Sequence, residues 1–236
     1  MRTFSVFVLI PIVTVCYSVA VMIHMGMFRD PAVFYVYARS WSRLLLRLAG
    51  VTVTVQGVSK LQGLAAGVPR IYAANHASLF DIPVLLGYLP DNVRIMYKRE
   101  LERIPVFGWC LRMSPFIAVN RTNAREANAA IEQTAASIQR GPSVLVFPEG
   151  TRSTSGELGT FKRGVLSLAA KASTPIQLVA LVGTNRIMPA KTFRVRGGQV
   201  TLNILHSVDA PVSLTRDEER ALLERMHDAI AAGLDL

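Results

Sequence analysis

An uncharged apolar run at the front of the chain limits most strongly what this chain can fold into. Residues 4–28 contain no Asp, Glu, Lys or Arg and consist mostly of Val, Ile, Met and Phe. At about 1.5 Å per helical residue, this run can cross a hydrocarbon core of about 30 Å. A cleaved signal peptide has a shorter run, whereas this one continues past Ser18-Val19-Ala20. A buried core helix is a further alternative. We expect a membrane-anchoring helix that spans the bilayer or lies in one leaflet.

A second helix is expected over residues 32–49. Arg39, Arg43 and Arg47 recur every four residues among leucines and aromatic side chains, so they share one helix face. Such a basic face suits an interfacial helix on anionic lipid, and the solvated face of an ordinary packed helix is the alternative. If the apolar run spans the bilayer, these arginines place this side in the cytoplasm. Residues 1–49 are therefore predicted to form an N-terminal two-helix membrane-anchoring segment.

Composition limits the class of partner. The chain has 236 residues and a net charge of +10, which fits nucleic acid, anionic lipid or a phosphate-bearing substrate. The sequence lacks zinc-finger spacing and the stacking-aromatic and basic motif of RNA-binding domains, so we expect no nucleic-acid partner. Cys16 and Cys110 have neither metal nor redox spacing, and the four histidines have no ligand spacing, so no metal site is expected.

Beyond residue 50, β-branched strands alternate with helices, which predicts an α/β fold with a mixed central sheet covered by helices, domain 50–236. The predicted strands are 51–55, 71–74, 94–97, 116–119, 143–147 and 176–182. The predicted helices are 82–88, 124–139 and 162–172. A hairpin of residues 193–196 and 199–205 is expected around Gly197-Gly198. The last helix, 215–232, starts with a capping box of Thr215 and Glu218.

A histidine and an aspartate follow the second predicted strand in Asn75-His76-Ala77-Ser78-Leu79-Phe80-Asp81. A histidine held by a carboxylate can remove a proton from a hydroxyl near neutral pH. On a continuous helix the two side chains would be about 500° apart, so a turn must lie between them. A capping box with Ser78 as N-cap and Asp81 at N3 would provide the turn. The capping box alone, with His76 as an ordinary loop histidine, is the alternative explanation.

Other predicted strands also end in polar residues. Phe147-Pro148-Glu149-Gly150-Thr151-Arg152-Ser153 follows strand 143–147. Its glycine allows close approach of a ligand, its threonine offers a hydroxyl, and its arginine can bind a phosphate through two hydrogen bonds. Arg121 and Lys98 follow two further strands. Ligands bind beyond the carboxyl ends of strands in such sheets, so we predict a base close to phosphate-binding cations. A surface turn with an unrelated arginine is the alternative for residues 147–153.

Together these motifs resemble the glycerolipid acyltransferase family, and within it the bacterial 1-acyl-glycerol-3-phosphate acyltransferases. Four blocks stand in the family's order: Asn75-His76-x4-Asp81, residues 116–121, Phe147-Pro148-Glu149-Gly150-Thr151-Arg152-Ser153, and Thr174-Pro175-Ile176. Residues 98–109 and Phe161-Lys162-Arg163-Gly164 are also similar to the family. The resemblance covers residues 50–190. Asn120 stands where the family often has an acidic residue, and Gln177-Leu178 departs from its fourth block.

The resemblance implies an O-acyltransferase of phospholipid biosynthesis. It would transfer an acyl chain from a thioester to the 2-hydroxyl of lysophosphatidate, giving phosphatidate. His76 would be the base and Asp81 would orient it. Lys98, Arg121 and Arg152 would bind the acceptor phosphate, and Glu149, Gly150 and Thr151 would shape that pocket.

The resemblance also implies partners and a location. The donor substrate would be acyl-CoA or acyl-carrier protein, with no separate cofactor. The enzyme would bind membrane lipids at the bacterial inner (cytoplasmic) membrane, with its catalytic domain on the cytoplasmic side. The alternatives are the same transfer to a lyso-ornithine lipid or another lysophospholipid, and a non-catalytic membrane-surface adaptor.

Overall fold

The computed structural model describes residues 2–61, 68–120, 124–138 and 141–235 and contains a seven-stranded sheet. The strand order is β1-β7-β6-β2-β5-β3-β4. Strands β6, β2, β5, β3 and β4 run parallel, whereas β7 is antiparallel to β6 and parallel to β1. The mixed central sheet is therefore confirmed. The strand bounds are Val51–Gln56 (β1), Ile71–Ala74 (β2), Val93–Lys98 (β3), Ile117–Val119 (β4), Ser143–Val146 (β5), Ile176–Val182 (β6) and Gly198–Val208 (β7).

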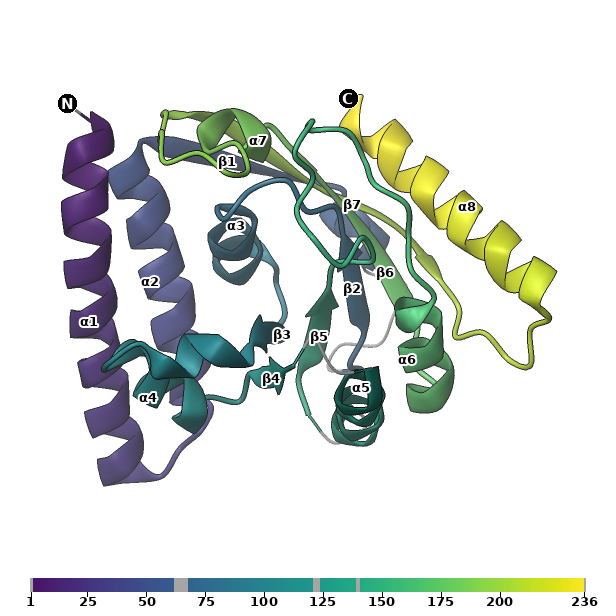
Figure 1. Cartoon of the computed structure of the whole chain (residues 1–236), viewed down its shortest axis with the longest axis horizontal. Helices are drawn as coiled ribbons and strands as arrows, with labels where there is room; N and C mark the ends of the chain where they lie inside the picture. The colour runs from purple at the N-terminus through teal and green to yellow at the C-terminus, as the bar shows by residue number, and fades with distance from the viewer. Residues whose placement is uncertain (1, 62–67, 121–123, 139–140, 236) are drawn as a thin grey trace.

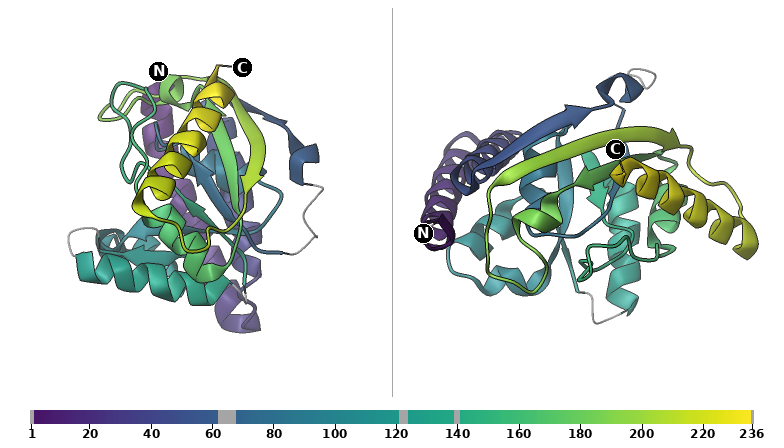
Figure 2. Two further views of the ribbon diagram at one scale, coloured as in Figure 1. Left: turned by 90° about the vertical axis from the view of Figure 1, so that its right-hand side faces the viewer. Right: turned by 90° about the horizontal axis from the view of Figure 1, so that it is seen from above.

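Helices cover both faces of the sheet (Figures 1 and 2). On one face lie α1 (Arg2–Phe28), α2 (Val33–Ala49) and α3 (Asp81–Tyr88), and on the other lie α5 (Ala124–Ile138), α6 (Gly164–Ala172) and α8 (Arg216–Leu234). The short elements are η1 (Val58–Leu61), η2 (Arg99–Arg103), α4 (Phe107–Met113) and α7 (Thr184–Ile187). Alternate residues of β2 point into the two cores, Tyr72 and Ala74 into the first and Ile71 and Ala73 into the second. This central strand is therefore apolar on both faces, as parallel strands between helix layers are.

Helix α1 packs beside α2 and α4 with much of its surface exposed (Figure 1). Trp41 Nε1 of α2 donates a hydrogen bond of 3.1 Å to Thr14 Oγ1 of α1. Val21 of α1 packs in a small cluster with Phe34 and Cys110. Within the described residues, Val6–Phe28 is the one span with the length and composition of a membrane-crossing helix, and 17% of its apolar window is buried. That low burial contradicts the alternative of a buried core helix.

The expected hairpin around Gly197-Gly198 is wrong. Residues 192–197 form no strand, and Gly198–Val208 is one strand between β1 and β6. The amide of Arg196 donates to the carbonyl of Ile187 at 2.8 Å, so this segment pairs with α7 and not with β7. Phe193 is 79% exposed and contacts Phe7 of α1 edge to face. By contrast, the capping box of Thr215 and Glu218 at the start of α8 is confirmed.

Candidate active site

The carboxyl ends of the parallel strands place the polar motifs at one edge of the sheet. Strand β2 lies beside β5, with Ala73 in register with Val146. His76 and Glu149 therefore follow their strands by similar numbers of residues and reach the same level. Strand β3 lies on the other side of β5, so Lys98 at its end is two strands away from β2. At about 4.8 Å between neighbouring strands, this separation is about 10 Å along the sheet.

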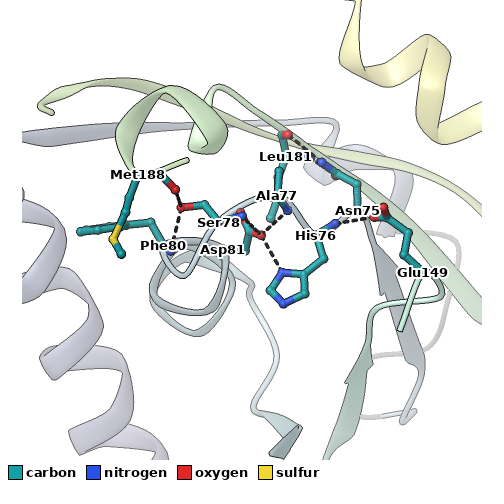
Figure 3. Close-up of polar contacts among 9 residues, drawn as sticks. All are labelled: Asn75, His76, Ala77, Ser78, Phe80, Asp81, Glu149, Leu181 and Met188. Carbon is teal, nitrogen blue, oxygen red and sulfur yellow. Dashed lines mark hydrogen bonds and ion pairs between the residues drawn. The ribbon is translucent and has the colours of Figure 1, made fainter. Parts of the chain in front are cut away.

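His76 and Asp81 form the predicted pair (Figure 3). His76 Nδ1 and Asp81 Oδ2 are 2.8 Å apart, the Asp81 side chain is fully buried, and the His76 side chain is 13% exposed. Because a carboxylate accepts hydrogen bonds, this contact assigns the proton to Nδ1 and leaves a lone pair on Nε2. The imidazole thus has the tautomer that a general base requires.

The turn that joins the two residues differs in part from the predicted capping box. Asp81 Oδ2 accepts hydrogen bonds of 2.8 Å from the amides of Ala77 and Ser78, which is one half of that box. The other half is wrong, because the Ser78 hydroxyl accepts from the Phe80 amide and donates to the Met188 carbonyl. Helix α3 begins at Asp81, after Phe80 as N-cap. Three N–H groups therefore converge on one carboxylate oxygen and turn Asp81 toward the imidazole.

Glu149 links the two loops of the site through both of its carboxylate oxygens. Its Oε1 accepts from the amide of His76 at 2.7 Å and its Oε2 from the amide of Gly159 at 2.9 Å. The residue is 5% exposed. Burial raises the pKa of Glu149, and the two amide hydrogen bonds partly oppose that shift. A second link is the hydrogen bond of 2.8 Å from the amide of Ser153 to the carbonyl of His76.

Phe147 is a contact that the sequence analysis did not single out. Its ring stacks on the His76 imidazole, with centroids 3.9 Å apart and planes inclined by 12°. The face of an aromatic ring attracts cations, so this contact favours the imidazolium that forms when His76 accepts a proton. The only sequence signal was its position directly after the apolar run of β5, because the neighbourhood of β5 and β2 is known only from the fold.

Two cations lie at the turn that follows Phe147. Gly150 has a φ of 73°, and a Cβ placed on it would stand 2.9 Å from Lys162 Nζ. Glycine at this position therefore allows the lysine side chain to lie over the turn. Arg152 is half-buried on the same turn, and Thr151 is exposed. Among the described residues neither Lys162 nor Arg152 has an acidic partner, whereas the nearby Arg163 pairs with Glu219.

The two remaining predicted cations are placed differently. Lys98 Nζ is 3.3 Å from Glu100 Oε1, and its side chain is 55% exposed. Arg121 lies outside the described residues, so the structure gives no account of it. Asn75, the first residue of the motif, fixes the loop to β6 by exchanging two hydrogen bonds with the backbone of Leu181.

The arrangement is suited to proton transfer next to an anionic group. The imidazole is oriented by a buried carboxylate and an aromatic ring, and its loop is hydrogen-bonded to a turn whose two cations have no acidic partner among the described residues. In the described part of the chain, no three His, Cys, Asp or Glu side chains gather as a metal site requires. The fitting chemistry is general-base activation of a hydroxyl on a phosphate-bearing molecule.

Curated relatives of this chain are named as acyltransferases. A 1-acyl-sn-glycerol-3-phosphate acyltransferase from Brassica napus chloroplasts is 33% identical over 158 residues, 65% of this chain and 46% of that protein. The yeast enzyme of the same name is 28% identical over 197 residues, 82% of this chain and 63% of that protein. The chain spans about half the length of the first curated relatives that it matches.

A solved structure extends the likeness to the whole chain. The crystal structure of the 1-acyl-sn-glycerophosphate acyltransferase PlsC from Thermotoga maritima superimposes with a TM-score of 0.80 and 26% identity. It covers 99% of this chain and 94% of that one, so the N-terminal helices are included in the match. Residues 52–182, which hold His76, Asp81 and the turn with Arg152, match the family model described as Acyltransferase. The chain belongs to the acyltransferase family.

Proposed function

We propose that the protein transfers an acyl chain from a thioester to the 2-hydroxyl of 1-acyl-glycerol-3-phosphate and forms phosphatidate. The observation that carries the proposal is the His76–Asp81 pair, held at 2.8 Å with Nε2 of the imidazole left to act as a base. The relatives named for this activity and the matching family model support the same reaction.

The proposed reaction needs no covalent acyl-enzyme. Nε2 of His76 takes the proton of the 2-hydroxyl while the oxygen attacks the thioester carbonyl. The carbon–sulfur bond then breaks, and the imidazolium returns the proton to the departing thiolate. Asp81 stays ionised and stabilises the imidazolium, as the aspartate of hydrolase triads does. The transferred proton and the electron pairs of the bonds formed and broken are thus accounted for without a cofactor. Acyl-CoA or acyl-carrier protein would supply the thioester.

Phosphate recognition is proposed for the cations around the turn. Arg152 is the main ligand in this scheme, since guanidinium matches phosphate through two hydrogen bonds. Lys162, held over Gly150, is added to the predicted set of Lys98 and Arg121. Thr151 lies beside Arg152 and is exposed, so its hydroxyl is available to the same ligand.

The proposed location is the inner membrane of a bacterium, with α1 in the cytoplasmic leaflet and the active site on that side. The exposed apolar face of α1 supports membrane association. Both the acceptor and the product have acyl chains that partition into lipid, so the base must work at the surface of a bilayer.

The test is an assay of the purified full chain in detergent, with acyl-CoA or acyl-carrier protein as donor, lysophosphatidate as acceptor, and thiol release as the readout. We expect release that His76→Ala abolishes and that the matched control His206→Ala, on an exposed residue of β7, leaves unchanged. Full activity in His76→Ala would overturn the assignment of the base. Release with a lyso-ornithine lipid but not with lysophosphatidate would instead identify the alternative acceptor.

A further inference from the structure

A second basic site lies outside the active site, in a cavity beside α2. The cavity has a volume of about 450 Å³ and is bounded by α2, Tyr17 of α1 and Asn92 before β3. Arg39, Arg43 and Arg47 all line it, one helical turn apart. We infer that this cavity binds the phosphate headgroup of an anionic membrane lipid.

Two of the arginines are held in place by the end of α3. Arg39 donates to the carbonyls of Pro90 and Asp91 at 3.4 and 3.2 Å. Arg43 donates through Nε to the carbonyl of Gly87 at 2.9 Å and stands 5.4 Å from the centre of the Tyr88 ring. These contacts match the ordinary packed helix considered for the basic face. They fix the guanidiniums but leave their charges in place, because a carbonyl does not neutralise a cation.

The cavity has no acidic residue to balance its three cations. None of its lining side chains is Asp or Glu. Asp91 precedes the lining residue Asn92, and its carboxylate is engaged elsewhere. Its Oδ2 lies 3.3 Å from Arg70 Nε and accepts hydrogen bonds from the hydroxyls of Tyr72 and Ser143. Burial, and then the charge of Arg43, lower the pKa of Arg39, and the Asp91 carboxylate opposes this shift only in part. Like charges four residues apart on a helix repel each other, so a bound anion would relieve a cost that the fold carries.

Tyr35 adds an unpaired polar group next to the cavity. It lines the same cavity, is 7% exposed, and its hydroxyl has no hydrogen-bond partner among the described residues. Buried hydroxyls are nearly always paired. The charge of Arg94, which does not line the cavity, acts on this hydroxyl and partly opposes the rise that burial causes in the pKa of Tyr35. By contrast, Tyr17, which also lines the cavity, has its hydroxyl hydrogen-bonded to Ser40 Oγ at 2.9 Å.

The surroundings favour a lipid over free phosphate. Val36 lines the cavity and is 66% exposed, and Leu44 adds a second apolar side chain. The Tyr17 wall belongs to α1, whose outer face exposes apolar side chains along its length. A headgroup bound to the arginines would therefore have apolar surface beside it for its glycerol and acyl chains.

The test measures the melting temperature of the full chain in neutral detergent with added short-chain lipids. We expect phosphatidylglycerol to raise the melting temperature, and phosphatidylcholine or inorganic phosphate at equal concentration to have much less effect. The variant Arg39→Gln/Arg43→Gln/Arg47→Gln should lose this shift. The control Arg216→Gln/Arg220→Gln/Arg225→Gln removes the same three charges from exposed positions of α8, across the molecule (Figure 1), and should keep it.

A single substitution keeps the test valid if the triple variant fails to fold. Arg47 makes no side-chain hydrogen bond to another described residue, so Arg47→Gln should fold. It should bind the lipid about tenfold more weakly, because it loses about one charged contact. An undiminished shift in the α2 variants would overturn the site, as would an equal loss in the α8 control. An equal shift with inorganic phosphate would overturn the lipid as ligand. None of these readouts depends on acyl transfer.

Discussion

Among single residues, Asp81 has both a structural and an electrostatic role. Its Oδ2 accepts from the imidazole and from two amides, and its side chain is fully buried. In Asp81→Asn the amide oxygen can still accept some of these bonds, but a neutral group no longer stabilises an imidazolium. We expect kcat to fall by about 10²- to 10⁴-fold, by analogy with the same change in a serine protease triad. Asp81→Ala should also lower the melting temperature, because the Ala77 and Ser78 amides lose their acceptor. Wild-type kcat in Asp81→Asn would contradict the proposed role.

Glu149 tests whether a residue of the motif acts through structure alone. Both of its carboxylate oxygens accept backbone amides. In Glu149→Gln an NH₂ group must face one of these N–H donors, so we expect a loss of about 1–3 kcal/mol of stability. Activity should fall with it, because the His76 loop loses an attachment. The measurements are denaturant unfolding and thiol release at saturating acceptor.

Glu157→Gln is the matched control, since Glu157 is exposed in the same loop and its side chain has no hydrogen bond to a described residue. If Glu149→Gln kept its stability but lost activity, Glu149 would instead act on the substrate.

At the scale of elements, local patterns predicted most of the fold. Strands β2, β5 and β6 were recognisable because each is a short apolar run buried on both faces. The hairpin prediction failed because Gly197-Gly198 resembles a turn locally, whereas pairing with α7 and with both β1 and β6 depends on distant residues. The same limit applies to the site. The spacing of His76 and Asp81 indicated a pair, but the stacking of Phe147 on His76 depends on which strands are neighbours.

The orientation of α1 in lipid follows from its packing on α2. If α1 crossed the bilayer, the adjacent α2 would carry Arg39, Arg43 and Arg47 into hydrocarbon. Each arginine would add a free-energy cost of insertion of about 2.5–3.5 kcal/mol. The domain division at residue 49 stays a prediction, but Leu46 and Ala49 of α2 share a core with α3, so α2 cannot leave the sheet freely. We therefore expect α1 to lie in one leaflet.

Cys16 can report this orientation directly. It is exposed near the middle of Val6–Phe28, whereas Cys110 is buried, so a thiol-reactive fluorophore should label Cys16 alone. A spanning helix would place the label about 15 Å deep, and an interfacial helix about 5–10 Å deep. We expect stronger quenching by lipids with a nitroxide near the headgroup than near the chain end. The reverse order would show a spanning helix. In the control Cys16→Ser/Arg225→Cys, the label lies on α8 and should be quenched by neither lipid.

For the whole molecule, the parallel part of the sheet determines how far each cation lies from the base. His76 follows β2, the turn with Arg152 follows the adjacent β5, and Lys98 ends β3, one strand farther away. Lys98 is also paired with Glu100 and exposed, whereas Arg152 and Lys162 have no acidic partner among the described residues. Distance and pairing thus both rank Lys98 last, and the two-bond match of guanidinium to phosphate ranks Arg152 above Lys162.

This ranking predicts a graded loss of acceptor affinity. Because a charged hydrogen bond contributes about 1.5–3 kcal/mol, Arg152→Gln should lower kcat/KM for lysophosphatidate by about 10- to 100-fold. Lys162→Met keeps the apolar stem over Gly150 and should lower kcat/KM less, and Lys98→Met should lower it least.

The measurement compares lysophosphatidate with a monoacylglycerol of the same chain. This acceptor lacks the phosphate, so all three variants should match the wild type on it. Equal losses on both acceptors would mean that these residues support the fold and not the phosphate. A larger effect at Lys98 than at Arg152 would place the phosphate over β3, and the hydroxyl would then be too far from His76 to be activated.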